Sequence, residues 1–209
     1  MIDVLREARG ATEIWTLRLN RPDKANSLTR DMLRAIETAT AEAEQAGAAA
    51  LVLTGMGKVF SAGADLEEAR AGLATDGIWE RVSSRIASLP CLTIAALNGT
   101  LAGGAFGMAL ACDLRITVPQ AGFFYPVMKL GFLPQPSDPG RLSSLIGPAR
   151  ARMILMASQK IDAATALDWG LVDRVVETEE LAQTVTELSD AVCAAPPEIR
   201  KGIKAMIPG

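Results

Sequence analysis

The chain has 209 residues, of which 49% are hydrophobic and 22% are charged, so it has the size and composition of a globular protein with a sizeable core. A net charge of −3 with no basic block argues against nucleic acid or an anionic membrane surface as the main partner. The absence of histidine excludes Ser-His-Asp and Cys-His nucleophiles, histidine bases and most catalytic zinc sites.

The N-terminus and the cysteines indicate a cytoplasmic protein. The opening residues, MIDVLREARG, carry charges where a signal peptide needs an apolar core. Cys91, Cys112 and Cys193 are odd in number, far apart and set in apolar surroundings. We therefore expect buried, reduced thiols and no metal site.

The first half of the chain predicts strands and helices in alternation. Trp15, Leu17 and Leu19 alternate with polar residues, which is the pattern of a strand with one buried face. The predicted elements are a strand over 12–20, a helix from the cap Thr29 to Gly47, a strand over 50–54, a turn and helix after Asp65, and an amphipathic helix over 76–89.

The stretch 91–113 has no charge before Asp113 and predicts a buried strand over 92–97, a turn at Asn98-Gly99 and a buried helix over 105–112. Such a strand-turn-helix unit can direct backbone N–H groups at a ligand oxygen. The glycines and Asn98 argue against a transmembrane helix, and the glycine spacing differs from G-x-G-x-x-G. Close packing of a core helix remains an alternative for this stretch taken alone.

The second half predicts mainly helices. Its elements are a strand over 114–118, a short segment from Phe123, a proline-rich loop over 131–140, helices over 149–157 and 163–169, a strand over 171–176, a helix over 178–194 and a last helix from Pro196 towards Met206. No linker or charge block divides the chain, so we predict one domain over 1–209. The order of elements predicts an α/β fold with weakly repeated ββα units and a helical C-terminal part.

Five segments, taken together and in order, resemble the crotonase or enoyl-CoA hydratase/isomerase superfamily. They are RP…NSL at 21–28, FSAGADL at 60–66, NG…GG…CD at 98–113, KLG…P…RL at 129–142 and A…GLV at 166–172. The resemblance implies a crotonase-like spiral of ββα units, an acyl-CoA thioester as substrate with no separate cofactor, a role in fatty acid metabolism and a homotrimer or hexamer.

The resemblance also implies positions for the site. The backbone N–H groups of Ala64 and Gly104 would form an oxyanion hole that stabilises a thioester enolate.

The CoA contacts that the resemblance implies fall on Lys24, Ala25, Ala62, Asp65 and Leu66. Lys24 either pairs with a phosphate or is a solvated loop lysine. For Asp65 a helix cap is favoured over an acid.

The chain departs from the family where acid and base chemistry is expected. The two glutamates of the hydratases are replaced by Gly107 and Val127, and the carboxylate of the isomerases and dehalogenases by Gln135. Asp138, between two prolines, is the nearest candidate base, with a turn-forming aspartate as the alternative reading. Tyr125 and Ser137 are weaker candidates.

These residues predict an enzyme that carries out enolate chemistry on an acyl-CoA but hydrates simple enoyl-CoA esters poorly, because paired carboxylates suit hydration. The alternative is a catalytically silent acyl-CoA-binding or assembly protein. A protease of similar architecture is disfavoured, because no histidine is present to activate a serine. Relative to the family pattern, the chain ends at 207–209 without the last C-terminal helices, which puts the pocket cover and the trimer contacts in doubt.

Overall fold

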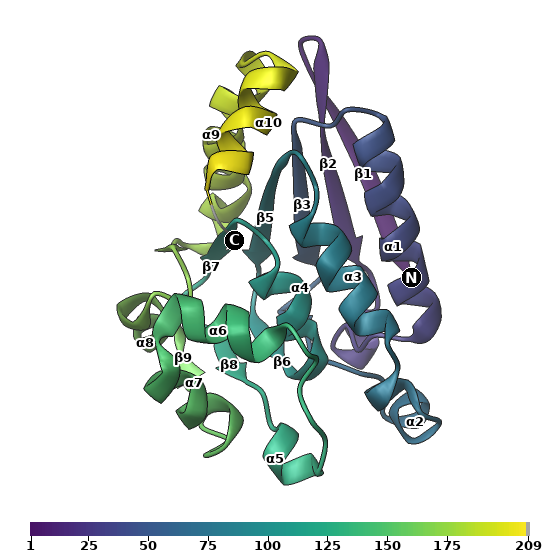
Figure 1. Ribbon diagram of the computed structural model, residues 1–209, viewed down its shortest axis with the longest axis vertical. Coiled ribbons are helices and arrows are strands. Elements are labelled where there is room, and N and C mark those ends of the chain that lie inside the picture. Colours follow the sequence, from purple (N-terminus) through teal and green to yellow (C-terminus); the bar gives the residue numbers. More distant parts are fainter. Residues whose placement is uncertain (208–209) are drawn as a thin grey trace.

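The computed structural model describes residues 1–207 and is built on two sheets (Figure 1). The larger sheet has the strand order β1-β2-β3-β5-β7-β10, in which only β1 is antiparallel to its neighbour. Its strands are β1 (Ile2–Arg9), β2 (Thr12–Leu19), β3 (Ala50–Gly55), β5 (Leu92–Leu97), β7 (Leu114–Thr117) and β10 (Arg174–Val175).

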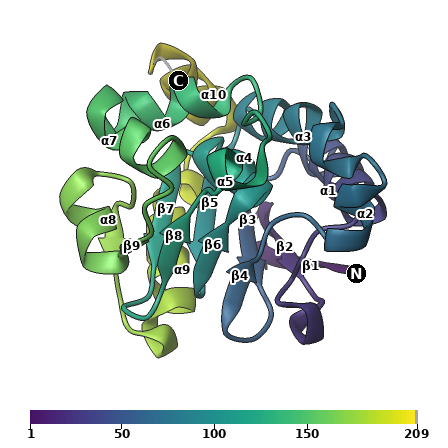
Figure 2. The same ribbon diagram turned by 90° about the horizontal axis from the view of Figure 1, so that it is seen from below.

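The smaller sheet has the order β4-β6-β8-β9 and faces the viewer in Figure 2. Its strands are β4 (Val59–Ser61), β6 (Thr100–Ala102), β8 (Gly122–Phe124) and β9 (Ile161–Asp162). The first three are parallel, so their carboxyl ends meet at one edge of this sheet. The segments that follow these three strands are therefore brought together.

Helices cover both faces of the larger sheet. Figure 1 shows α1 and α3 on one side and α9 with α10 on the other, and α9 contacts four of the strands. The α-helices are α1 (Arg30–Gln45), α2 (Leu66–Arg70), α3 (Ile78–Ala87), α4 (Phe106–Leu110), α5 (Val127–Leu130), α6 (Asp138–Ile146), α7 (Pro148–Leu155), α8 (Ala163–Trp169), α9 (Leu181–Ala194) and α10 (Pro197–Met206). Short 3₁₀ turns are η1 (Pro22–Lys24), η2 (Leu73–Thr75), η3 (Gly103–Ala105) and η4 (Thr178–Glu180).

The local signals that predicted these elements are confirmed at several ends. The Thr29 hydroxyl accepts a hydrogen bond from the Met32 N–H at the start of α1. Asp162 accepts from the Thr165 N–H and caps α8, which Gly170 ends in a left-handed conformation. Trp15 is buried with the other apolar residues of β2 in the single core of the α/β fold.

Three predicted elements were wrong in extent, and the strands β1, β6 and β9 were missed. Strand β1 escaped because most of its side chains are exposed, so it lacks an alternating pattern. Helix α6 begins inside the predicted loop 131–140, because a proline in the first helical turn removes only an N–H that has no partner there. The predicted helix over 105–112 divides into η3 and α4, and the strand predicted over 171–176 shrinks to β10.

The cysteines are free thiols, and burial raises the pKa of Cys91 to about 11 and that of Cys112 to about 12. Cys193 is only partly buried. None of the helices within residues 1–207 combines the length and apolarity needed to cross a bilayer. The predicted C-terminal stop includes Pro208 and Gly209, which lie outside the described residues.

Glycine allows β4 and β6 to approach closely. A methyl group built on Gly99 would lie only 2.0 Å from the carbonyl oxygen of Lys58, just before β4. Asn98 fixes the same crossing, because its side chain accepts from the Gly55 N–H at 2.9 Å and donates to the Gly57 carbonyl at 2.8 Å. The relative position of the two segments that follow β4 and β6 depends on this contact.

We expect Gly99→Ala to destabilise the fold by about 3 kcal/mol, because the backbone of Lys58 must move to admit the methyl group. The matched control is Gly140→Ala in α6, where the added methyl group meets no heavy atom within 4 Å apart from its chain neighbours and the backbone of its own helix. We expect the control to be neutral or stabilising by about 0.5–1 kcal/mol. Urea unfolding of both variants measures the difference, and equal stabilities would contradict the described crossing of β4 and β6.

Candidate active site

The segments that follow β4 and β6 touch through two glycines. Gly63 has φ +92°, and a methyl group built on it would lie 3.0 Å from the Ala102 carbonyl oxygen and 3.2 Å from Gly103 Cα. Gly103 also has a positive φ, of +57°. The positive φ favours glycine at both positions, and at Gly63 the lack of space favours it as well.

Two backbone N–H groups flank this contact. Leu28 donates its N–H to the Gly63 carbonyl at 2.7 Å and accepts from the Asp65 N–H at 2.9 Å, which leaves the Ala64 N–H between them without an acceptor in residues 1–207. Gly104 is the second residue of η3, where a helical turn provides no internal acceptor for an N–H. Both residues are half-buried. Because Gly63 contacts Gly103, the predicted pair of N–H groups lies on adjoining segments.

The ring of Trp79, from α3, forms the wall beside Gly104. A methyl group built on Gly104 would lie 3.2 Å from the Trp79 ring. The ring is buried and held by a hydrogen bond of 2.8 Å from Nε1 to the Leu73 carbonyl. A side chain at position 104 would therefore have to displace a fixed aromatic ring.

The predicted CoA-contact residues lie on two adjoining segments. The Ala62 N–H donates to the Ala25 carbonyl at 2.9 Å, which joins the loop before α1 to the turn after β4. Lys24 is exposed, and Leu66 at the start of α2 is 73% exposed. These residues thus border one surface, and their contact with CoA stays a prediction.

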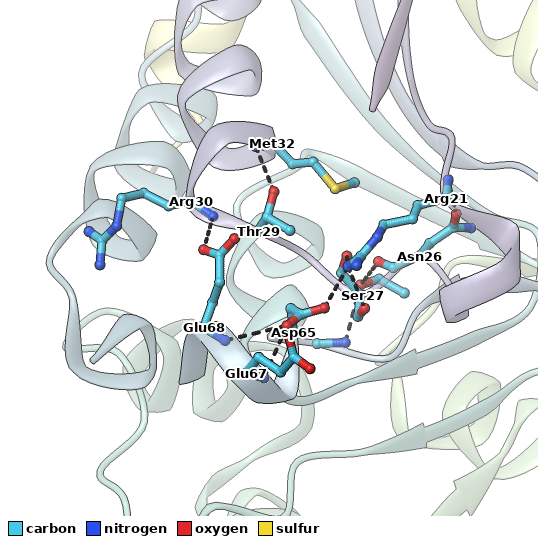
Figure 3. Close-up of polar contacts among 11 residues, drawn as sticks. Arg21, Asn26, Ser27, Thr29, Arg30, Met32, Asp65, Glu67 and Glu68 are labelled. Carbon is cyan, nitrogen blue, oxygen red and sulfur yellow. Dashed lines mark hydrogen bonds and ion pairs between the residues drawn. The ribbon is translucent and has the colours of Figure 1, made fainter. Parts of the chain in front are cut away.

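The side chain of Asp65 is already engaged within the protein. It caps α2 by accepting from the N–H groups of Glu67 and Glu68, and it pairs with Arg21 at 2.7 Å (Figure 3). The hydrogen bond from Arg21 is the main cause that lowers the pKa of Asp65. The prediction of a cap is confirmed, and this carboxylate holds α2 against the loop before α1.

Asp138 lies in the space beside Gly107. Its side chain is 0% exposed, and its Oδ2 accepts from the Tyr125 hydroxyl at 2.9 Å, whereas its Oδ1 has no hydrogen-bond partner in residues 1–207. A methyl group built on Gly107 would lie 2.9 Å from this Oδ1. Asp138 is the first residue of α6, and its N–H donates to the Gln135 carbonyl at 3.0 Å, so it closes the turn that leads into the helix as well as placing a carboxylate beside Gly107. A carboxylate from α6 therefore fills the volume next to position 107 of α4.

A comparison with known proteins identifies the family of this chain. The family described as Enoyl-CoA hydratase/isomerase matches residues 9–207. The chain belongs to this family. Its members include the crotonase-fold proteins to which the five motifs pointed, and the expected fold is confirmed.

Individual proteins and solved structures of the same family are similar to this chain over most of its length. The short-chain-enoyl-CoA hydratase of Clostridium acetobutylicum is 34% identical over 93% of this chain and 77% of its own length. The 4-chlorobenzoyl coenzyme A dehalogenase-2 of an Arthrobacter species is 32% identical over 93% of this chain and 74% of its own. The crystal structure of enoyl-CoA hydratase from Bacillus anthracis covers 98% of this chain and 81% of its own, with a TM-score of 0.88 and 29% identity.

Burial sets the protonation of the Asp138–Tyr125 pair in this family member. Burial is the main cause that raises the pKa of Asp138, to about 6, and the charge of Glu80 raises it further. The hydrogen bond from Tyr125 and the charge of Arg141 lower this pKa but do not outweigh burial. Burial, and secondarily Asp138, raises the pKa of Tyr125 far above its usual value. At neutral pH the phenol is thus a hydrogen-bond donor beside a carboxylate.

The sequence did not reveal Glu80 on α3. Its carboxylate accepts from both the N–H, at 3.1 Å, and the hydroxyl of Ser137, and from the Ser84 hydroxyl at 3.0 Å. Burial opposes its ionisation, but these hydrogen bonds lower the pKa of Glu80 overall. Glu80 therefore fixes the residue before Asp138, and Ser137 serves as its donor. No motif marks Glu80, because it is one polar residue of an amphipathic helix.

The two other positions where the family pattern has a carboxylate, 127 and 135, hold Val127 and Gln135 in this chain. Val127 is buried at the start of α5, and Gln135 is half-buried with its carbonyl accepting from the Asp138 N–H at 3.0 Å. Within residues 1–207 no group of three or more Cys, Asp or Glu residues is arranged to hold a metal ion. Asp138 is thus the carboxylate closest to the family's first glutamate position.

We expect Asp138 to make this family member less stable as the pH rises. The folded chain keeps a proton on Asp138 that the unfolded chain loses from the ordinary value of 3.8, so unfolding free energy falls between pH 4 and about 6. The size is about 2–3 kcal/mol. Asp138→Asn removes this loss, so its stability relative to the parent should rise by that amount between pH 4 and pH 8.

Asp162→Asn is the control, because hydrogen bonding to Thr165 lowers the pKa of Asp162 and gives the opposite sign. Denaturant unfolding at both pH values measures the differences. A stability difference between Asp138→Asn and the parent that does not change with pH would contradict the buried carboxylate.

Proposed function

We propose that the protein binds an acyl-CoA thioester, stabilises its enolate with the N–H groups of Ala64 and Gly104, and uses Asp138 to move a proton at the α carbon. The observation that carries this proposal is the unpaired Oδ1 of Asp138 beside Gly107, where hydratases of the family have a glutamate. The family match supports the acyl-CoA as ligand.

The proposed step needs one base and two donors. The Asp138 carboxylate takes the α proton, the electron pair of the C–H bond passes to the thioester carbonyl, and the enolate oxygen is held by the two N–H groups. Each such donor contributes about 3–4 kcal/mol to transition-state stability. A pKa of about 6 leaves Asp138 mainly ionised at neutral pH and able to return the proton. Return of the proton to the α carbon gives exchange, and in a substrate with a β,γ double bond return to the γ carbon gives isomerisation.

Hydration fits the site less well. Adding water across a double bond calls for one group to activate water and another to deliver the proton. Gly107 and Val127 offer neither, and the carboxylate of Glu80 is taken up by hydrogen bonds from Ser137 and Ser84. The similarity to a protein named as a dehalogenase supports a reaction other than hydration within this family.

One observation favours the alternative of a silent acyl-CoA-binding protein. Asp138 is 0% exposed, so a substrate reaches its Oδ1 only if the surrounding side chains move. If they do not, the two backbone donors and the surface near Ala62 still suffice for binding. Binding and proton transfer must therefore be measured separately.

The proposed setting is a cytoplasmic homotrimer or hexamer that takes part in fatty acid metabolism. Three free thiols, of which Cys91 and Cys112 are buried, support a reducing compartment. Ile199, Ile203 and Met206 of α10 are more than half exposed, and such an apolar helix face supports association between chains.

We expect the protein to exchange the α proton of a saturated acyl-CoA with D₂O, and Asp138→Asn to abolish this exchange while binding persists. NMR of the recovered acyl-CoA measures exchange, and calorimetry measures binding. Crotonyl-CoA hydration should be far slower than that of the hydratases with both glutamates. Binding without exchange would favour the silent alternative, and hydration at ordinary rates would refute the role given to Gly107 and Val127.

We expect Gly107→Ala to reduce exchange at least tenfold, because the methyl group would lie 2.9 Å from Asp138 Oδ1 and must displace the carboxylate. Gly140→Ala on the exposed side of α6 is the matched control and should exchange at the parental rate. Acyl-CoA affinity should change little in either variant. Equal exchange rates for the two variants would argue that position 107 does not border the reacting proton.

A further inference from the structure

Tyr125 is held rigidly beside the carboxylate of Asp138. Its side chain is buried, and its ring stacks on that of Phe106 with centroids 5.3 Å apart and planes at 20°. Phe106 is itself fully buried at the start of α4. A ring packed in this way has a fixed position, so its hydroxyl meets Asp138 in one geometry.

The hydroxyl distinguishes the two oxygens of Asp138. It donates to Oδ2 at 2.9 Å, and Oδ1 is left without a partner on the side of Gly107. A carboxylate that turned part-way about its Cβ–Cγ bond would lose this hydrogen bond inside the core, so the bond fixes the plane of the carboxylate and keeps one oxygen directed at Gly107.

Resting on the function proposed above, we propose that Tyr125 is a positioning residue, which holds Oδ2 of Asp138 so that Oδ1 faces the substrate. Tyr125 need not touch the substrate for this role. It acts from the carboxyl end of β8 on a residue of α6.

Burial, nearby charges and the Tyr125 hydroxyl together set the pKa of Asp138. Glu80 of α3 raises the pKa of Asp138, Arg141 of α6 lowers it, and α4 contributes no titratable group within Phe106–Leu110. Burial is the largest influence and raises the pKa. The Tyr125 hydrogen bond is the first of the lowering effects. Its removal therefore leaves Asp138 harder to ionise.

Tyr125 is the only tyrosine of the chain, so two changes at this one site can be compared that should shift the pH profile in opposite directions. Tyr125→Phe keeps the stacked ring and removes the donor, so the rising limb of the pH profile for α-proton exchange should move up by about one pH unit. Global replacement of tyrosine by 3-fluorotyrosine labels this site alone. Fluorination makes the phenol a stronger donor, so the same limb should move down.

A second measurement, ¹⁹F NMR of the substrate-free protein, does not depend on catalytic turnover. The ¹⁹F resonance of the single fluorotyrosine should titrate with the ionisation of Asp138 in the protein without substrate, and Asp138→Asn should remove that titration. The fluorinated protein also keeps the test open if Tyr125→Phe does not fold. Ser144→Ala is the control, since its hydroxyl donates to the Gly140 carbonyl on the exposed side of α6 and contacts neither Asp138 nor Tyr125, and its profile should keep the parental midpoint.

The outcomes separate the two proposals. If Asp138→Asn retains exchange, the proposed function is wrong, and the fluorine titration still reports the contact. If Asp138→Asn abolishes exchange but neither tyrosine variant moves the midpoint, the positioning role of Tyr125 is overturned. A shift in the same direction for phenylalanine and fluorotyrosine would also overturn it.

Discussion

The site depends on how closely the backbones after β4 and β6 approach each other. Gly63 lies against Gly103, and Gly99 lies against the chain before β4, with no room for a side chain at Gly63 or Gly99. Parallel pairing of β4, β6 and β8 then delivers three segments to one edge of the smaller sheet. Two backbone N–H groups without acceptors in residues 1–207 and a buried carboxylate therefore come from adjoining segments.

The carboxylate of Asp138 is costly to the fold. A buried, half-satisfied carboxylate with a raised pKa lowers stability at neutral pH, and such costs are typical of functional sites. Tyr125 satisfies one oxygen, and Glu80 anchors the preceding Ser137. The surrounding structure therefore holds Asp138 from α3 and from the end of β8, and this keeps an unfavourable group in one place.

The sequence predicted what is local and missed what is brought together by folding. The caps at Thr29 and Asp162 depend on neighbours three residues away, and the cap at Asp65 on neighbours two and three away, so their patterns were visible. Helix α6 was hidden because the prolines around Asp138 signal a turn as strongly as a first helical turn. The contact of Asp138 with Gly107 and the role of Glu80 join separate elements, which no spacing in the chain reveals.

The contact between Gly107 and Asp138 bears on how members of this fold are sorted into active and inactive proteins. A survey that checks for glutamate at the aligned position would find glycine and count the centre as empty. Here the volume beside that glycine is occupied by an acidic group that enters from another helix. The acidic group of this chain is thus identified by its location in space, and the glycine at position 107 is the residue that leaves room for it.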